Sequence, residues 1–202
     1  MKYGTIYADP PWRFSTYSKK GLGRSAEAHY QCMSLDDIHK YPVQDYCADH
    51  CVLFLWVTDP MLPNAFSVIS SWGFNYKTVG FYWAKTKQKA VEPYNLSDFP
   101  IGTGYWSRAN PELCLLATRG YPKRRFADVR KLVVEPRREH SRKPDAIYKR
   151  IERLCPGPYL ELFARVHQPG WDAVGLDLSN GIQPRRWHSD AREFYDDDQQ
   201  PD

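Results

Sequence analysis

The first chemically distinctive residues of the chain are Asp9-Pro10-Pro11-Trp12, which follow the apolar stretch from Tyr3 to Ala8. A carboxylate, two rigid prolines and an indole in direct succession could hold a ligand that is flat and polar. The alternative is structural, because Asp-Pro often forms a turn at the end of a strand and Trp often packs in a core. The complete tetrapeptide at a strand end favours a binding site.

Polar residues also mark the ends of two later apolar stretches. Glu161 is followed by Arg165 and His167, and Asp177 lies near the end of the next stretch. Ligands of parallel α/β sheets bind beyond the carboxyl ends of the strands, so these residues are candidates for a nucleoside cofactor site. Strand-end acids also serve as helix caps and turn formers. No Gly-x-Gly-x-x-Gly or Gly-x-x-x-x-Gly-Lys-Ser/Thr motif is present, which argues against a dinucleotide fold and against NTP hydrolysis.

Apolar and helical patterns alternate along the chain and predict an α/β fold with a largely parallel sheet. Strands are expected over 3–8, 51–57, 74–84, 112–118, 131–134, 159–163 and 173–178, and helices over 34–40, 63–72 and 144–154. The segment 85–107 has no sustained periodicity, and a loop of this length in a compact domain is usually either functional or disordered. We expect one domain over residues 1–182 and a flexible acidic tail over 183–202.

The composition is that of an ordinary soluble domain, with 42% hydrophobic and 26% charged residues among 202. No apolar run approaches the length of a membrane span, and the N-terminus lacks a signal-peptide pattern. The five cysteines have no disulfide-framework spacing, which favours reduced thiols in the cytoplasm. Cys47, His50 and Cys51 have no second Cys/His pair at zinc-ligand spacing, so we predict no metal site.

Basic residues are concentrated between Arg119 and Arg153, where 13 Lys/Arg face five Asp/Glu for a local charge of +8. Such a block can be a solvated face. Combined with an aromatic content of 15%, it favours contact with a polyanion. Lys123, Arg124 and Arg125 are therefore candidate nucleic-acid contacts.

Adenine offers a chemical reason for the tetrapeptide. Its exocyclic amine is a poor nucleophile because the nitrogen lone pair is delocalised into the ring. A site that accepts both N–H groups would expose that lone pair, with Asp9 accepting one and a proline carbonyl the other. Trp12 could stack on the ring. Such a reaction needs neither a covalent intermediate nor a metal.

Asp9-Pro10-Pro11-Trp12 resembles the catalytic signature of amino-group methyltransferases. The surrounding chain is similar to the MTA-type family of the mRNA N6-adenosine methyltransferase catalytic subunit, with its bacterial and phage members. The matching blocks include "LFLWVT" at 53–58, "GYW.R.NPE.CLLATRG" at 104–120, "HSRKPDAIYKRIE" at 140–152 and "LELFAR" at 160–165. The resemblance implies a Rossmann-like α/β sandwich that uses S-adenosylmethionine, circularly permuted so that the catalytic motif precedes the cofactor motif.

The resemblance also implies roles for individual residues. The target adenine would be held by Asp9, Pro10, Pro11 and Trp12. The cofactor would be bound by Asp9, Arg108, Asn110, Glu112, Glu161, Arg165, His167 and Asp177. The nucleic acid would be contacted by His29, Tyr30, His140, Ser141 and Lys143, together with Lys123, Arg124 and Arg125 of the basic block. Many members have an amide where this chain has Leu176, beside Asp177.

Three functions follow from these observations. The first is N6-adenine methylation of DNA, which compact bacterial and phage members favour. The second is the same reaction on RNA. The third is a catalytically inactive subunit that only presents nucleic acid, against which the intact Asp-Pro-Pro-Trp argues. A homodimer is expected, because one small domain has limited surface for a duplex.

Overall fold

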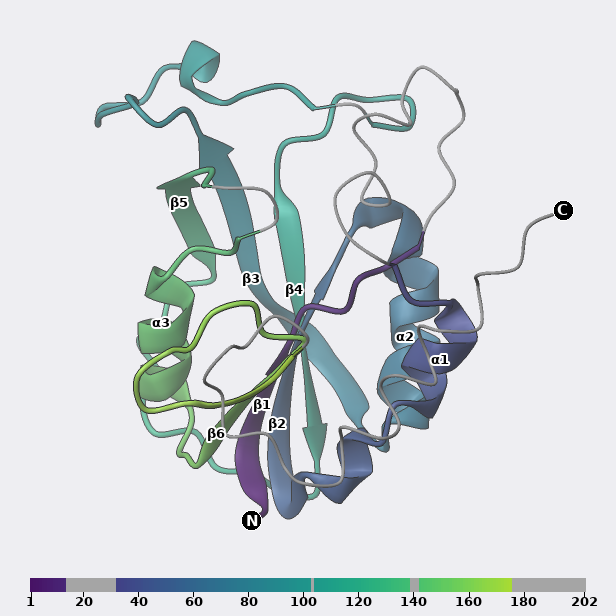
Figure 1. Cartoon of the computed structure of the whole chain (residues 1–202). Helices are drawn as coiled ribbons and strands as arrows, with labels where there is room; N and C mark the ends of the chain where they lie inside the picture. The colour runs from purple at the N-terminus through teal and green to yellow at the C-terminus, as the bar shows by residue number, and fades with distance from the viewer. Residues whose placement is uncertain (14–31, 103, 139–141, 176–202) are drawn as a thin grey trace, which may run out of the picture.

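The computed structural model describes residues 1–13, 32–102, 104–138 and 142–175 (Figure 1). Its centre is a seven-stranded sheet in the order β5-β3-β4-β2-β1-β6-β7. The strands are β1 (Tyr3–Ala8), β2 (Cys47–Val57), β3 (Asn75–Thr86), β4 (Glu112–Arg119), β5 (Leu132–Pro136), β6 (Tyr159–Leu162) and β7 (Asp172–Val174).

Six of these strands run in one direction, and β4 runs against both of its neighbours, β2 and β3. The carboxyl ends of β1, β2, β3 and β6 therefore meet the amino end of β4 at one edge of the sheet. We call this the site edge. It brings together residues that are more than 100 positions apart in the chain, beginning with Asp9, which follows β1, and Glu112, which opens β4.

Helices cover both faces of the sheet. The helices α1 (Leu35–Lys40) and α2 (Leu62–Ser71) lie on one face, and α3 (Ala146–Leu154) lies on the other (Figure 1). Short 3₁₀ turns occur at η3 (Val43–Asp45), η4 (Asp59–Met61) and η5 (Leu96–Asp98). Helix α1 begins after Ser34, whose hydroxyl accepts a hydrogen bond from the backbone N–H of Asp37, as the capping pattern predicts.

Each face of the sheet has its own hydrophobic core. On the α1/α2 face, Ile38, Val68 and Trp72 pack against the apolar side chains of β1 and β2. On the α3 face, Ile147 and Ile151 pack with aromatic residues from the central strands. The second core includes Tyr7, Trp56, Tyr148 and Trp171. Trp56 lies next to the carboxyl end of β2, so this core extends to the site edge.

The predicted α/β class and every predicted strand and helix are confirmed, with boundaries shifted by a few residues. The reversed direction of β4 was not foreseen, because an apolar run does not reveal strand direction. The end of the last predicted strand and the tail at 183–202 lie outside the described residues. Within the described residues, none of the helices has the length and apolar character needed to span a membrane.

Candidate active site

A buried ion pair between Asp9 and Lys143 lies at the centre of the site edge. Asp9 directly follows β1, and Lys143 lies three residues before α3. The Lys143 Nζ is 2.6 Å from Asp9 Oδ2 and 3.4 Å from Glu112 Oε2, and the lysine side chain is only 9% exposed. The two partners are 134 residues apart in sequence, so only the fold brings them together.

The ion pair belongs to a row of alternating charges. Lys85, near the end of β3, lies 2.5 Å from Glu112 Oε1, so Glu112 is held between Lys85 and Lys143. The ammonium of Lys143 also lies over the ring of Trp56, 5.3 Å from its centroid. Such a cation–π contact favours the charged form of the lysine. The row fixes the orientation of Asp9 from one side.

Burial and charge act in opposite directions on these groups. Burial raises the pKa of Asp9 above its ordinary value, and Lys143 and Arg165 partly offset this effect. Burial would lower the pKa of Lys143, but Asp9 and Glu112 more than compensate, so the pKa is raised and the lysine stays charged. Burial also disfavours ionisation of Glu112, yet Lys143 and Lys85 hold its pKa below the usual range.

The two prolines form a tight turn that fixes Asp9. The Trp12 N–H donates to the Pro10 carbonyl at 2.8 Å, and the Met33 N–H donates to the Pro11 carbonyl at 3.0 Å. Each carbonyl oxygen has a second lone pair that can accept another donor. The Trp12 indole is buried and donates from Nε1 to the Trp56 carbonyl at 2.9 Å. In this structure Trp12 thus fastens the turn to the end of β2, and stacking on a base remains a prediction.

A second acid, Glu161, lies at the end of the neighbouring strand β6. It is 8% exposed, and the Tyr148 hydroxyl donates to its Oε2 at 2.9 Å. Burial raises the pKa of Glu161 to about 8, despite the hydrogen bond from Tyr148, which acts in the opposite direction. Tyr7, the β1 partner of Glu161 in the sheet, lies in the second core, in edge contact with Tyr148 and accepting a hydrogen bond from the indole N–H of Trp56.

The chain turns sharply after β6. Phe163 has a positive φ of 62°, and Ala164 donates its N–H to the Val174 carbonyl at 3.0 Å. A Cβ atom on Gly175 would lie 1.9 Å from the Ala164 carbonyl oxygen, so only glycine fits there. Bulky residues with positive φ are uncommon and concentrate at ligand sites. Glu161 is therefore held at a close approach of two backbone segments.

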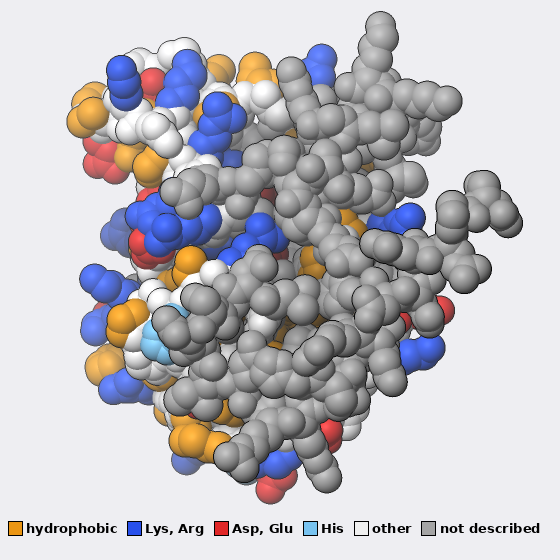
Figure 2. Space-filling view, in the orientation of Figure 1, with side chains coloured by type: hydrophobic (Ala, Val, Ile, Leu, Met, Phe, Trp, Pro, Cys, Tyr) orange, Lys and Arg blue, Asp and Glu red, His pale blue; other side chains and the backbone are white. Residues whose placement is uncertain are grey.

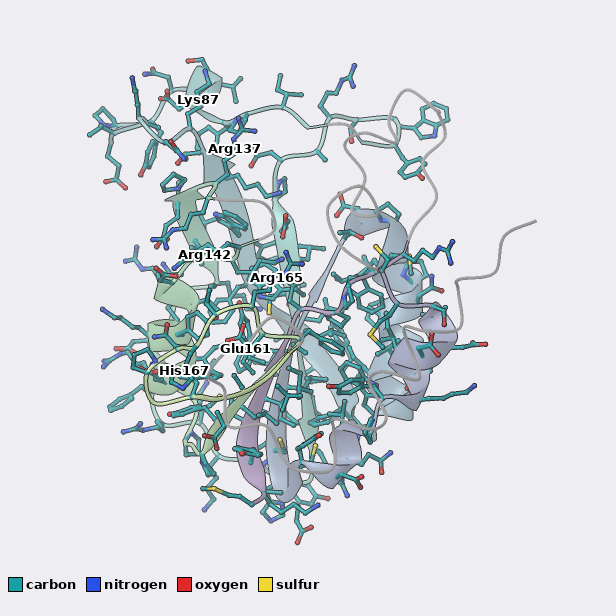
Figure 3. The ribbon with its side chains drawn as sticks, in the orientation of Figure 1. Lys87, Arg137, Arg142, Glu161, Arg165 and His167 are labelled. Atoms are coloured by element: carbon teal, nitrogen blue, oxygen red, sulfur yellow. The ribbon has the colours of Figure 1, made fainter. Side chains whose placement is uncertain are left out.

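Arg165 and His167 follow this turn and are both exposed. The charge of Arg165 lowers the pKa of Asp9, which places the guanidinium within electrostatic reach of that carboxylate. In Figure 3, Arg165 and Glu161 lie near the centre of the molecule, whereas His167 lies further along the loop towards α3. Electrostatics thus links Arg165 with Asp9, and a cofactor contact of His167 remains a prediction.

Asn110 and Arg108 lie in different surroundings: Asn110 is hydrogen-bonded to backbone, and Arg108 is exposed. The Asn110 side chain accepts from the Lys85 N–H at 3.1 Å and donates to the Lys85 and Pro100 carbonyls at 3.0 and 2.8 Å. All its donors are therefore engaged with backbone, and Asn110 ties the long loop to the end of β3. Arg108 is exposed on that loop. A cofactor contact of either residue remains a prediction.

The basic block does not form one surface. Lys123, Arg124 and Arg125 follow the carboxyl end of β4, which lies about 24 Å from the site edge at ~3.4 Å per residue. By contrast, Lys143 is in the site, and Arg137 follows β5 at the site edge. Figure 2 shows Lys and Arg side chains spread over the β5 and α3 side of the molecule. The predicted contacts His29, Tyr30, His140 and Ser141, and the predicted cofactor residue Asp177, lie outside the described residues.

Sequence reasoning did not single out Lys85, Tyr148 or Trp56. Each contacts a predicted site residue directly: Lys85 pairs with Glu112, Tyr148 donates to Glu161 and the Trp56 ring lies beneath Lys143. In the sequence, all three fit the strand or helix pattern around them as ordinary core or surface residues, so nothing marks them as part of a site. Their contacts follow from the strand order, which places β3 beside β4 and β2 beside β1, and from the packing of α3 on the second core.

The arrangement fits a cofactor with a nucleoside and a charged amino-acid part. A carboxylate at the Glu161 position accepts hydrogen bonds from ribose hydroxyls, and such donors would favour its ionised form. Asp9 can accept from an ammonium group, and Lys143 and Arg165 can offset a carboxylate. Acids and bases both line the site, which suits a zwitterion better than a polyphosphate.

Comparison with known proteins agrees with this geometry. The MT-A70 family profile matches residues 3–177. The chain is 33% identical to the type II methyltransferase M.MunI of Mycoplasma sp., over 88% of this chain and 78% of that protein. It is also 32% identical to the N(6)-adenosine-methyltransferase subunit METTL3 of Danio rerio, over 88% of this chain and 28% of that protein. The chain thus spans about a quarter of the length of METTL3 but most of M.MunI.

The fold agrees with the Rossmann-like sandwich that the sequence predicts, and the predicted catalytic tetrapeptide after β1 precedes the predicted cofactor strand β6 in the chain. Methyltransferases of the MT-A70 type use S-adenosylmethionine as the methyl donor, and the charged groups at Asp9 and Glu161 fit that molecule. The chain belongs to the MT-A70 family of S-adenosylmethionine-dependent N6-adenine methyltransferases.

Proposed function

We propose that this chain methylates the exocyclic amine of adenine in DNA. The observation that carries the proposal is the buried Asp9–Lys143 pair at the site edge, one strand away from Glu161. This geometry supports two ligands side by side, a base at Asp9 and a nucleoside cofactor at Glu161. S-adenosylmethionine supplies an electrophilic methyl group when bound.

Asp9 and the Pro10–Pro11 turn prepare the amine. One N–H of the adenine amino group donates to Asp9, and the other donates to the free lone pair of a proline carbonyl. The two hydrogen bonds draw the nitrogen lone pair out of the ring. Lys143 favours the ionised form of Asp9, against the effect of burial, and fixes its orientation through Oδ2. The electrostatic groups are thus in place before the reaction begins, which is the usual source of catalytic advantage.

A proton must leave N6 as the new carbon–nitrogen bond forms. The amine is neutral before transfer and would be cationic after it, so loss of one N–H proton restores a neutral product. Asp9 can accept that proton because burial raises the pKa of its carboxyl above the ordinary value.

Glu161 and Arg165 serve the cofactor in this proposal. The Glu161 carboxylate accepts the ribose hydroxyls, and Tyr148 holds it in position. Arg165 balances negative charge near Asp9. His167 and Asp177 complete the cofactor contacts predicted from the sequence.

DNA is the preferred substrate because the chain covers 78% of a type II methyltransferase but about a quarter of the N(6)-adenosine-methyltransferases. RNA is the alternative, supported by the names of those relatives. We further propose that the enzyme acts in the cytoplasm, in keeping with its free cysteines, and that it forms a homodimer.

Parallel assays on matched oligonucleotides test the proposal. Wild-type protein with radiolabelled S-adenosylmethionine should methylate DNA that contains adenine faster than RNA of the same sequence. Asp9→Asn should abolish transfer and keep the fold, whereas Asp49→Ala, at the opposite edge, should leave activity unchanged. Mass spectrometry of the digested product should detect N6-methyladenine. An active Asp9→Asn protein would contradict the mechanism, and calorimetry without S-adenosylmethionine binding would favour an inactive partner subunit.

A further inference from the structure

Trp106 is the most exposed aromatic residue of the described chain, and it sits at the tip of a hairpin. Gly102 and Ala109 form an antiparallel bridge, in which the Gly102 N–H donates to the Ala109 carbonyl at 2.6 Å. The Trp106 side chain is fully exposed between them, and Tyr105 is 45% exposed. A large indole in water is unfavourable and gives no stability to the fold.

The backbone at the tip is held in a strained conformation. Trp106 has a φ of 66°, and the Ser107 N–H donates to the Tyr105 carbonyl at 2.7 Å, which closes a three-residue γ-turn around Trp106. This turn with positive φ is rare and costly for a bulky side chain. A Cβ atom on Gly104 would lie 2.4 Å from the Ser107 carbonyl oxygen, so the tip also requires glycine at that position.

The hairpin is anchored beside the active site. Asn110 binds the backbone of Lys85 and of Pro100, and Glu112 follows two residues later. Six Cα–Cα steps separate Trp106 from Glu112, so the two Cα atoms are at most about 22 Å apart. That span corresponds to about six base steps of a duplex at ~3.4 Å each. Trp106 therefore lies no more than about six base steps from Glu112, at the edge of the sheet that holds Asp9.

Basic side chains also occur on the long loop that contains Trp106. Arg108 is two residues from Trp106, and Lys87 and Lys89 lie at the start of the same loop, all of them exposed. The Arg137 N–H donates to the Thr86 carbonyl, which brings β5 and its arginine beside Lys87 (Figure 3). An exposed aromatic ring with neighbouring cations is the arrangement that binds single-stranded nucleic acid.

We infer that Trp106 is a stacking platform for a nucleobase that flanks the target adenine. The inference rests on the proposed function and adds a substrate contact to it. A base that leaves the duplex for Asp9 disrupts the stacking of its neighbours. The indole replaces one lost stacking contact, while Arg108, two residues along the chain, attracts an adjacent phosphate. The strain at Trp106 is retained because the γ-turn presents the ring away from the loop.

Affinity for a fluorescein-labelled single-stranded oligodeoxynucleotide containing adenine tests the inference. Loss of one base–aromatic stack weakens binding by about 5–150-fold, so Trp106→Ala should raise the Kd by a factor in that range. Trp106→Phe keeps a ring and should lose less. The oligonucleotide with 2-aminopurine beside the adenine should show fluorescence quenching with wild-type protein and weaker quenching with Trp106→Ala.

Two further variants control for folding and for nonspecific effects. Tyr121→Ala removes another exposed aromatic ring, after the far end of β4, and should leave the Kd unchanged. Trp106→Gly removes the ring and suits the positive φ, so it should weaken binding without lowering the Tm. A Trp106→Gly protein with a lower Tm and unchanged affinity would overturn the inference.

The experiment separates this inference from the proposed function. If wild-type protein methylates adenine and Trp106→Ala binds the oligonucleotide equally well, the stacking role of Trp106 is refuted and the proposed methyltransferase activity is supported. If wild-type protein binds the oligonucleotide through Trp106 but transfers no methyl group, the proposed function is refuted and the stacking role of Trp106 is supported. A Trp106→Ala change in sedimentation with no change in oligonucleotide Kd would show a protein-docking surface instead, in line with the exposed Val91, Leu96 and Ile101 on the same loop.

Discussion

Replacing Glu161 by Gln should stabilise the cofactor-free protein at alkaline pH. The pKa of Glu161 is raised from 4.5 to about 8 in the fold, so the folded state holds a proton that the unfolded state has released throughout this range. The contribution of Glu161 to stability therefore falls as the pH rises from about 4.5 to about 8. Gln has the same shape and can accept the hydrogen bond from Tyr148. Because Gln does not ionise, its contribution to stability does not fall with pH.

The magnitude follows from the width of the window. Each pH unit between the two pKa values changes the free energy of unfolding by about 1.4 kcal/mol. Between pH 6 and pH 8, wild-type protein should lose roughly 2–3 kcal/mol relative to Glu161→Gln. For a domain of this size that difference corresponds to roughly 4–12 °C in Tm. Other titrating groups affect both proteins equally and cancel in the comparison.

Thermal unfolding of both proteins at a series of pH values provides the measurement. The gap in Tm should be small near pH 5 and should widen towards pH 8, with Glu161→Gln the more stable protein. Parallel curves would show that Glu161 ionises normally and would refute the argument from burial. Calorimetry adds a second readout, since binding of S-adenosylmethionine to wild-type protein near pH 7 should release about one proton that Glu161→Gln does not release.

The other predictions concern the supports of the site. Lys143→Met leaves Asp9 buried without its partner and should cost about 3–5 kcal/mol in chemical denaturation, and adding Asp9→Asn should recover most of that loss. Trp12→Phe removes the hydrogen bond to the Trp56 carbonyl and should cost about 1–2 kcal/mol, with reduced kcat in the methylation assay. Gly175→Ala places a Cβ atom against the Ala164 carbonyl and should lower the Tm and abolish cofactor binding in calorimetry. An unchanged Tm in any of these variants would contradict the contact concerned.

Local patterns predict the elements of this fold well, since the apolar stretches and the Ser34 cap depend only on neighbouring residues. They do not predict the direction of β4, because an apolar strand can pair either way. The same limit applies to the site. Asp9 and Glu161 could be selected from their strand-end positions, whereas the Lys143 partner lies 134 residues away and depends on the complete strand order.

The aromatic residues show a second limit. Trp12 and Trp106 both lie in sequence blocks that resemble the family, and the sequence alone favoured Trp12 as the residue that stacks on a base. In the structure Trp12 is buried and Trp106 is exposed. Burial depends on what the rest of the chain places over a ring, and a short motif contains no information about that.

The antiparallel strand β4 has a practical consequence for engineering. Because β3 and β4 pair directly as neighbours, from Asn75–Thr118 to Trp83–Glu112, the loop between them closes a hairpin and does not cross the sheet. Its sequence can therefore be exchanged with the ends held fixed by Lys85 and Asn110. Loops grafted at this position provide a route to altered sequence preference on an unchanged catalytic core.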